Sequence, residues 1–320
     1  MGIDGEQARR GGEVHGMTTA HLRPILVVSH TGRDDSIEAA IHVINQLRVA
    51  GANPVLERSE RDDICASGVE TGPVLLLDED VSAAELEIVI VLGGDGTILR
   101  AAELVRRHPA PLLGINLGHV GFLAESERDD LDEAVRRAIS GEYIVEERLT
   151  LAVSVEQDGE VVYENWALNE ATVEKASRER MLEVLLEVDD RPLSSFGCDG
   201  VVVSTPTGST AYGFSAGGPV IWPTVEAIML VPLSAHALFA RPLVVSPASS
   251  IGIRLLERNV GTGVLWCDGR RAFELGQGAQ VSVRRSSVPV RLARLHQGPF
   301  TDRLVQKFRL PVTGWRGDGK

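Results

Sequence analysis

The chain has 320 residues, of which 43% are hydrophobic, and its formal net charge is −13 at pH 7. A chain of this length and composition has enough apolar surface for two packed domains. The acidic excess argues against a protein that coats nucleic acid or an anionic membrane, although it leaves room for a local basic pocket.

The cysteines and the N-terminal residues indicate the cellular compartment of the protein. Cys65, Cys198 and Cys267 are odd in number and widely spaced, and the eight histidines show no metal-ligand spacing, so neither a disulfide framework nor a metal site is predicted. No apolar run approaches the length of a membrane span, and the N-terminus lacks the apolar core of a signal peptide. We therefore expect a cytoplasmic protein with neither a membrane nor a nucleic-acid partner. We also expect residues 1–20 to form a disordered leader, with Met17 as an alternative start.

Strands and helices alternate in the first part of the chain. The segment "RPILVVSH" (23–30) is predicted as a buried strand, because it is a short apolar run rich in β-branched residues. A helical pattern that opens with acidic residues follows it and ends at Gly51. A strand at 86–94, a helix at 98–108 and a strand at 110–118 come next. This alternation predicts an α/β domain with a mostly parallel, Rossmann-like sheet.

From about residue 146 the apolar residues alternate with a period of two. A hairpin turn is predicted at Asp158-Gly159, and helical periodicity is scarce through the following segments. The stretch 301–315 is helical again, and we expect it to return to the first domain. The predicted parts are a disordered leader, 1–20; an α/β domain, 21–145 plus 298–320; and a β-rich domain, 146–297.

The stretch "VLGGDGTILR" (91–100) places three glycines around one aspartate directly after an apolar strand. The end of a strand, a glycine-rich turn and the start of a helix make an anion site, because backbone N–H groups point outward and glycine lets phosphate oxygens approach. Gly93, Gly94 and Gly96 fit this role. Their spacing matches neither the G-x-G-x-x-G dinucleotide fingerprint nor a P-loop.

Asp95, inside this loop, has two interpretations. It is either a helix cap or turn former, which are favoured roles of aspartate, or a residue with a chemical role. A carboxylate beside a phosphate site is electrostatically unfavourable unless a metal or a proton transfer uses it. The chemical role would therefore be that of a general base or a Mg²⁺ partner. Thr97 either caps the following helix or contacts the phosphate.

A second unusual stretch is "CDGVVVSTPTGSTAYGFSAGGP" (198–219). Its glycines, hydroxyl side chains and tyrosine either bind ribose and phosphate or form a loop of tight turns. Its "TGSTA" does not match the G-x-S-x-G nucleophile elbow, so a serine hydrolase is not indicated. Asn169 and Glu170 lie in a strand pattern and are either a hydrogen-bonded structural pair or ligand contacts. Asp268-Gly269 is predicted as a hairpin turn.

Four motifs, in their order and spacing, resemble those of NAD kinases: "VLGGDGTILRAAE", "PLLGINLGHVGFLAE", "ALNEATVEK" and "DGVVVSTPTGSTAYGFSAGGPVIWP". The resemblance covers roughly residues 23 to 315. "GGDGT" alone is shared with diacylglycerol and sphingosine kinases, but those lipid kinases continue with a "PLGTGND"-like stretch, where this chain has "LLGINLGHVGF". One departure is Ala235, at a position that many NAD kinases fill with proline.

The resemblance implies an enzyme that transfers phosphate from ATP, or from polyphosphate, to the adenosine-ribose 2′-hydroxyl of NAD. It also implies Mg²⁺ or another divalent cation with ATP, a homodimer or homotetramer, and a dinucleotide site that borrows groups from a neighbouring subunit. Asp95 would be the catalytic base. The residues implied to bind NAD are Asp95, Gly96, Arg100, Phe122, Asn169, Glu170, Asp199, Thr210, Ala211, Tyr212, Gly213, Phe214 and Ser215. Those implied to bind the phosphate donor are Gly93, Gly94, Gly96 and Thr97.

Two rival functions stay open at this point. A lipid kinase would phosphorylate a long-chain alcohol and not NAD. A non-catalytic NAD(P) sensor would bind the dinucleotide without releasing ADP. The carboxylate of Asp95 argues against the sensor, because a site that only binds phosphate would do better without it.

Overall fold

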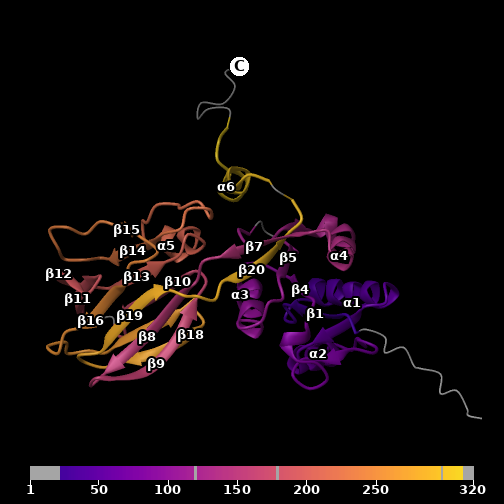
Figure 1. Ribbon diagram of the computed structural model, residues 1–320, viewed down its shortest axis with the longest axis horizontal. Coiled ribbons are helices and arrows are strands. Elements are labelled where there is room, and N and C mark those ends of the chain that lie inside the picture. Colours follow the sequence, from indigo (N-terminus) through magenta and orange to yellow (C-terminus); the bar gives the residue numbers. More distant parts are fainter. Residues whose placement is uncertain (1–21, 119–120, 178–179, 297, 313–320) are drawn as a thin grey trace, which may run out of the picture.

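The computed structural model describes residues 22–118, 121–177, 180–296 and 298–312. The leader predicted for residues 1–20 lies outside the described residues. Figure 1 shows two parts side by side, one with helices around a sheet and one made of strands, with α6 (Phe300–Phe308) above their junction. None of the helices in the described part of the chain has the length and hydropathy that crossing a membrane requires.

An eight-stranded sheet lies at the centre of the first part. Its order is β3-β2-β1-β4-β5-β20-β7, with β6 beside β5, and all pairs are parallel except β20 with β7. Every residue of β1 and β4 is buried, as expected for parallel strands covered on both faces. The strands are β1 (Pro24–Ser29), β2 (Asn53–Leu56), β3 (Leu75–Leu76), β4 (Ile88–Leu92), β5 (Leu112–Asn116), β6 (Ser126–Glu127), β7 (Ile144–Arg148) and β20 (Val290–Arg294).

Helices cover both faces of this sheet and complete the predicted α/β domain. The buried side chains of α1, α2 and α4 pack on one face, and those of α3 pack on the other. Ile37, Ala40 and Ile44 form part of the buried stripe of α1, because a spacing of three and four residues places them on one side of a helix. The helices are α1 (Asp34–Val49), α2 (Arg58–Ala66), α3 (Asp95–Leu104) and α4 (Leu131–Ser140), with 3-10 turns at η1 (Ala83–Glu85) and η2 (Arg128–Asp130).

The second part is β-rich, as the alternating pattern predicts. Two six-stranded antiparallel sheets, β15-β14-β13-β10-β17-β18 and β12-β11-β16-β19-β8-β9, enclose one apolar core. Buried and half-buried residues alternate along β8 and β11, because successive side chains point to opposite faces of a sheet. The strands are β8 (Leu151–Gln157), β9 (Glu160–Ala167), β10 (Glu170–Lys175), β11 (Leu182–Val188), β12 (Arg191–Cys198), β13 (Gly200–Ser204), β14 (Ile228–Leu233), β15 (Leu243–Val245), β16 (Ile251–Leu255), β17 (Gly263–Cys267), β18 (Arg271–Leu275) and β19 (Gln280–Arg285).

Two Asp-Gly turns connect neighbouring strands of these sheets, as predicted. Asp158 and Gly159 lie between β8 and β9 with φ of 55° and 84°, and Asp268 and Gly269 lie between β17 and β18 with φ of 53° and 63°. Positive φ at both positions matches the twist of paired strands, and aspartate followed by glycine tolerates it.

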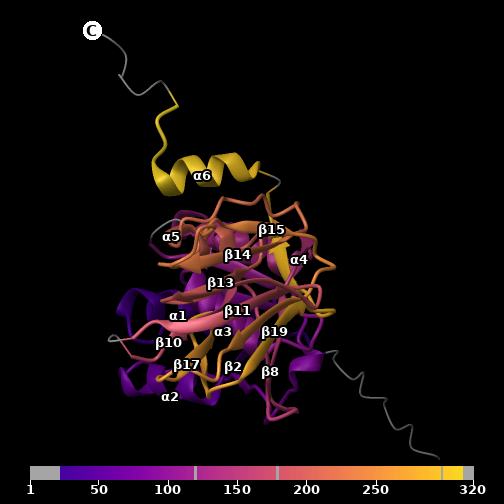
Figure 2. The same ribbon diagram turned by 90° about the vertical axis from the view of Figure 1, so that its left-hand side faces the viewer.

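The predicted range 146–297 for the β-rich domain differs from the observed sheets at both ends. The last residues of β7 and all of β20 belong to the first sheet, where they pair with each other and β20 also pairs with β5. The sequence "VRLAR" of β20 alternates like its neighbours, so its pattern alone assigns it to the wrong sheet. The predicted helix near the C-terminus is present as α6. In Figure 2, α6 crosses above α5 (Tyr212–Ser215) and the strands beside it.

Candidate active site

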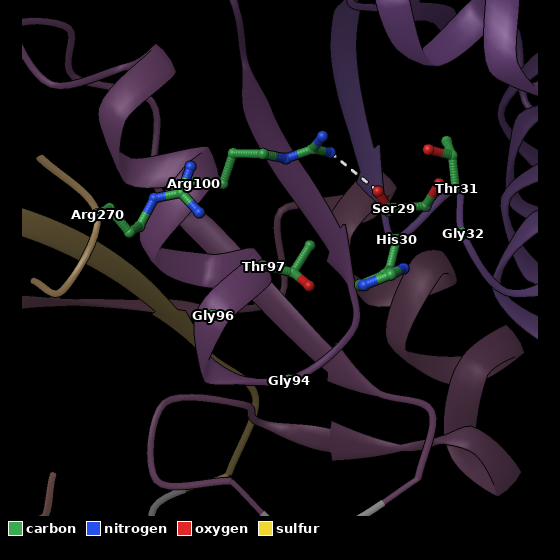
Figure 3. Close-up of a pocket in the computed structure, with 9 residues that line it drawn as sticks. All are labelled: Ser29, His30, Thr31, Gly32, Gly94, Gly96, Thr97, Arg100 and Arg270. Carbon is green, nitrogen blue, oxygen red and sulfur yellow. Dashed lines mark hydrogen bonds between the residues drawn. The ribbon is translucent and has the colours of Figure 1, made fainter.

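The first sheet has a topological switch point between β1 and β4. The chain leaves β1 for β2 on one side and leaves β4 for β5 on the other, so the loops after these two strands diverge and leave a crevice. The crevice lies at residues 29–32, from the end of β1 onward, and at residues 93–97, from the end of β4 into the first turn of α3. The crevice has a volume of about 510 Å³. Its lining, drawn in Figure 3, consists of Ser29, His30, Thr31, Gly32, Gly94, Gly96, Thr97, Arg100 and Arg270.

The turn that contains Gly93, Gly94 and Gly96 borders the crevice and leads into the first turn of α3. A Cβ on Gly93 would lie 2.5 Å from Oγ1 of Thr97, so this position needs glycine. A Cβ on Gly94 or Gly96 would meet nothing within 4 Å, so these two leave open space above the helix. No side chain caps the N-terminus of α3. The N–H groups of Thr97 and Ile98 donate to the carbonyl oxygen of Gly94. The anion site expected at this helix start stays a prediction.

Asp95 begins α3, and its carboxylate faces the loop after β5. Oδ2 accepts a hydrogen bond from the N–H of Phe122 at 3.2 Å, and Oδ1 accepts one from the N–H of Leu123 at 3.1 Å. A Cβ on Gly121 would lie 2.5 Å from Oδ1, so glycine there lets the loop close on the carboxylate. Asp95 therefore does not cap its helix. It is half-buried, and it lies just outside the lining of the crevice.

Arg100 lies further along α3 and reaches back to β1. Its Nη2 donates to the carbonyl oxygen of Ser29, drawn dashed in Figure 3, and to Oε2 of Glu60, both at 2.9 Å. The side chain of Glu60 is fully buried, and its Oε1 also accepts from the N–H and the hydroxyl of Ser29. Burial raises the pKa of Glu60, while the Ser29 hydrogen bonds and Arg100 lower it. Neither Ser29 nor Glu60, the two residues that hold Arg100, was predicted from the sequence as a site residue.

His30, Thr31 and Gly32 are further lining residues that the sequence analysis missed. The signal for them was present, because they directly follow a predicted buried strand, and ligands bind outside the carboxyl ends of such strands. No comparable signal marked Glu60, which is one of several acids in the charged segment "RSERDDICA" of α2.

In the β-rich part of the chain, Asp268 holds the predicted Asn169-Glu170 pair through backbone hydrogen bonds. Its Oδ2 accepts from the N–H of Leu168 at 3.0 Å, and its Oδ1 accepts from the N–H groups of Asn169 and Glu170 at 2.7 and 3.3 Å. Nη2 of Arg271 donates to the same Oδ2 at 2.6 Å. The Asp268-Gly269 turn is thus more than the predicted hairpin connection, because the Asp268 carboxylate binds the N–H groups of three successive residues that lead into β10.

Glu170 is buried beside this carboxylate. Burial, and secondarily the charge of Asp268, raises the pKa of Glu170 to about 8, while a hydrogen bond from the backbone of Tyr212 opposes the shift. Among the described residues, its Oε2 has no hydrogen-bond partner. Glu170 therefore offers a neutral or charged carboxyl oxygen to a ligand near neutral pH.

The raised pKa of Glu170 predicts a pH-dependent effect of Glu170→Gln on stability without ligand. The carboxyl group of Glu170 binds its proton more tightly in the folded state than in the unfolded state. Its contribution to the free energy of unfolding is therefore complete below about pH 4.5 and is lost as the pH rises through about 8. The amide does not titrate. Between pH 5 and 8, the free energy of unfolding of the variant should therefore rise relative to that of the wild type by roughly 1.4 kcal/mol per pH unit. The Tm of the variant should rise relative to that of the wild type over the same range. A Tm difference that stays flat over this range would contradict the raised pKa.

The segment "TPTGSTAYGFS" is attached to the same pair through its backbone. A Cβ on Gly208 would lie 2.1 Å from the carbonyl oxygen of Asn169, and the N–H of Thr205 donates to that oxygen at 2.9 Å. The 3-10 turn η3 (Gly208–Thr210) and α5 follow. The implied NAD-binding residues of this segment thus lie next to Asn169 and Glu170. They are Thr210, Ala211, Tyr212, Gly213, Phe214 and Ser215.

Two of the predicted residues, Gly213 and Asp199, have close contacts within the protein. Gly213 is buried, and a Cβ there would lie 2.6 Å from the methyl group of Met229, so its role is close packing. Asp199 lies at the opposite end of β10 from Glu170, where its Oδ1 pairs with Nζ of Lys175 at 2.5 Å. Burial raises the pKa of Tyr212, and the charges of Glu174, Glu170 and Asp199 add to the shift, so Asp199 lies near that residue.

Phe122 connects the two halves of the site. Its backbone N–H contacts Asp95, and its ring lies 5.7 Å from the ring of Phe308 in α6. Phe308 in turn lies 4.7 Å from Phe214. A second connection joins α3 to the Asp268 turn, because Oε1 of Glu103 lies 3.0 Å from Nε of Arg270. The crevice and the Asn169-Glu170 cluster are therefore held together from two sides.

Among the described residues, no group of three or more histidine, cysteine, aspartate or glutamate side chains could hold a metal ion by itself. The three cysteines are free, and Cys198 and Cys267 are buried.

Two family models match the chain: the ATP-NAD kinase N-terminal domain over residues 25–143, and the ATP-NAD kinase C-terminal domain over residues 168–295. The NAD kinase of Leifsonia xyli is 69% identical over 302 residues, which cover 94% of this chain and 99% of that protein. The NAD kinase of Mycobacterium tuberculosis is 51% identical over 310 residues, which cover 93% of this chain and 99% of that protein.

Two solved structures are similar to this fold. The structure of an NAD kinase from Archaeoglobus fulgidus in complex with ATP has a TM-score of 0.65 and 26% identity, and the match covers 90% of this chain and 99% of that one. The structure of yeast NADH kinase complexed with NADH has a TM-score of 0.79 at 21% identity, over 94% of this chain and 90% of that one. The second likeness supports the fold alone.

Proposed function

Because the chain belongs to the ATP-NAD kinase family, and is therefore a phosphotransferase that converts NAD to NADP, we propose that Asp95 is its catalytic base. The observation that carries this proposal is the position of the Asp95 carboxylate. Asp95 starts α3 at the open glycine turn, and its carboxylate accepts hydrogen bonds from the N–H groups of Phe122 and Leu123. The ring of Phe122 is connected through Phe308 to Phe214 of the segment proposed to bind NAD.

The reaction needs a sugar hydroxyl, a terminal phosphate and a base in one place. The 2′-hydroxyl oxygen of the adenosine ribose attacks the γ-phosphorus of ATP, the bond from that phosphorus to the bridging oxygen breaks, and ADP leaves. Asp95 takes the hydroxyl proton. An ionised carboxylate has about four acceptor positions, and Phe122 and Leu123 use two of them, so capacity remains for the hydroxyl.

The phosphate donor binds in the crevice after β1 and β4. Gly94 and Gly96 leave its space open, Thr97 lines it, and the guanidinium groups of Arg100 and Arg270, each paired with a glutamate, lie beside it. Mg²⁺ or another divalent cation enters with ATP, held mainly by the phosphate oxygens, and neutralises phosphate charge when bound. That assignment fits a crevice whose lining consists of hydroxyl groups, glycines, one histidine and two arginines.

NAD binds across the junction at Asn169, Glu170, Tyr212 and their neighbours. Asp199 would contribute as well, because its charge acts on Tyr212 of the same chain. A homodimer or homotetramer is supported by the exposed apolar side chains of Leu238 and Phe239. We place the enzyme in the cytoplasm, where free thiols persist, and expect neither a membrane nor a nucleic-acid partner.

One assay tests the function: incubation with ATP, Mg²⁺ and NAD, followed by measurement of NADP and ADP. We expect the two products in equal amounts. Parallel reactions with polyphosphate as donor and NADH as acceptor define the substrate range. Dinucleotide binding without ADP release would instead identify a sensor. Phosphorylation of sphingosine or diacylglycerol, with none of NAD, would identify a lipid kinase.

A further inference from the structure

A second cavity lies at the edge of the first sheet, away from the crevice. It is enclosed by β7, β20, α6 and residues 222–224, and its volume of about 530 Å³ is in the range of small-molecule sites. Buried arginines form one side and exposed apolar groups form the other. We propose that this cavity, here called the arginine pocket, binds a small organic anion, a phosphate or carboxylate joined to a flat ring. We further propose that the bound anion regulates the enzyme.

The arginine pocket carries more positive than negative charge. Glu146 lies 3.1 Å from Nη2 of Arg148 and 2.6 Å from Nε of Arg294. Glu125 lies 2.9 Å from Arg294 and 2.6 Å from Arg303. Three guanidinium groups thus share two carboxylates, and Arg148 and Arg294 are more than nine-tenths buried. An uncompensated buried charge is costly, so an anion in the pocket would balance it.

Arg148 is the group with open hydrogen-bonding capacity. Its Nη2 is paired with Glu146, while its buried Nε donates to no group in the described part of the chain. Burial, reinforced by the neighbouring charges of Arg294 and Arg303, lowers the pKa of Arg148 to about 10, while Glu146 opposes the shift. Carboxylate and phosphate oxygens are the natural partners of such a guanidinium, because its planar fork matches their geometry.

The opposite side of the arginine pocket favours a ring. The side chain of Trp222 is 43% exposed, and its ring meets that of Phe300 edge to face at 5.3 Å. Ile144 is also exposed beside them. Large apolar groups left in contact with solvent next to buried arginines suit a ligand with one apolar end and one anionic end. Inorganic phosphate would use only the arginines.

The arginine pocket is two contacts away from Asp95. Nη1 of Arg303 donates to the carbonyl oxygen of Phe122 at 3.2 Å, and the N–H of Phe122 donates to Asp95. The rings of Phe300 and Phe122 lie 5.9 Å apart. A ligand that shifts α6 would therefore shift the loop that holds Asp95. Any effect of the anion on NAD affinity must be matched by an equal effect of NAD on anion affinity.

The first test measures binding of phenyl phosphate to the full-length enzyme by calorimetry. The active site is filled beforehand with NAD and a non-hydrolysable ATP analogue. We expect one site per chain, with phenyl phosphate binding at least about tenfold more tightly than inorganic phosphate or benzyl alcohol alone. Benzoate in place of phenyl phosphate separates a carboxylate preference from a phosphate preference. Binding to the free enzyme that disappears when NAD and the analogue fill the active site, or no binding at all, would overturn the proposal.

Variants locate the site. Arg148→Met should weaken phenyl phosphate binding at least about tenfold. The control Arg291→Met should change it less than about twofold, because Arg291 pairs with Glu147 on the opposite face of the same two strands. Trp222→Ala provides a second variant if Arg148→Met fails to fold, since Trp222 is half-exposed. It should weaken phenyl phosphate but not inorganic phosphate. Unchanged binding in the pocket variants would refute the assignment.

The regulatory part has its own readout. Saturating phenyl phosphate should change kcat or the KM for NAD at least about twofold in the wild type, because the site contacts the loop of Asp95. The change should persist in Arg291→Met and disappear in Arg148→Met. Binding with unaltered kinetics would leave a ligand site without regulation and would overturn this part. The binding measurement requires no turnover. Its result therefore tests the arginine pocket whether or not Asp95 is the catalytic base.

Discussion

Asp95→Asn is expected to lower kcat for NADP formation by about 10²–10⁴-fold, while the KM for NAD changes by less than about threefold. The amide cannot accept the proton of the ribose hydroxyl, so the step with the most demanding chemistry loses its base. Binding suffers little, because the dinucleotide contacts proposed for Asn169, Glu170 and Tyr212 are untouched. Steady-state kinetics with NAD as the varied substrate give both parameters.

The same carboxylate also holds a loop, and this structural role must be separated from proton transfer. The amide of the Asp95→Asn variant keeps one acceptor for the N–H groups of Phe122 and Leu123 and loses the other, a cost of about 1 kcal/mol. The Tm should therefore fall only slightly. A nearly normal kcat, with a lower Tm, would mean that Asp95 is only a support for the loop.

A pair of glycine variants tests the position of Asp95 without removing it. Gly121→Ala would place a Cβ 2.5 Å from its Oδ1, so the carboxylate must move, and misplacement by about 1 Å can cost about 10²-fold in rate. Gly118→Ala in the same loop meets nothing within 4 Å and should leave kcat near the wild-type value. Equal activity of the two variants would argue against a precisely placed base.

The local parts of the site could be predicted from the sequence because each is encoded in a short stretch. Gly93 must be glycine to avoid Thr97, and Gly94 and Gly96 follow a strand that its β-branched residues identify. The Asp158-Gly159 turn is likewise a property of two adjacent residues. In such stretches the backbone requirement and the residue type coincide.

The parts that escaped prediction depend on residues far apart in the chain. Glu60 matters because α2 presents it to Ser29 and Arg100, and nothing in a segment rich in acids distinguishes the one that becomes buried. Arg294 belongs to the first sheet because β20 returns there, although its alternating pattern resembles that of the β-rich part. Side-chain burial and sheet membership are decided by tertiary packing, which periodicity does not contain.

Asp268→Asn is expected to destabilise the fold by about 1–3 kcal/mol, because buried N–H donors lose an acceptor while Arg271 keeps Glu103 as an ion-pair partner. Each carboxylate oxygen of Asp268 accepts two hydrogen bonds: Oδ1 from Asn169 and Glu170, and Oδ2 from Leu168 and Arg271. An amide has one acceptor oxygen and one donor nitrogen. Either orientation therefore sets the NH₂ group against two donors. Denaturant unfolding of the ligand-free enzyme measures the loss.

The matched control for this substitution is Asp158→Asn. Both aspartates precede glycine in a hairpin turn with positive φ, a conformation that asparagine adopts as readily, so the turn itself survives in both variants. Asp158 is exposed, and its replacement should cost less than about 0.5 kcal/mol. Equal losses would show that the turn, not the carboxylate, matters. A large loss at Asp268 alone, with a higher KM for NAD, would show that this carboxylate orders the Asn169-Glu170 pair for the dinucleotide.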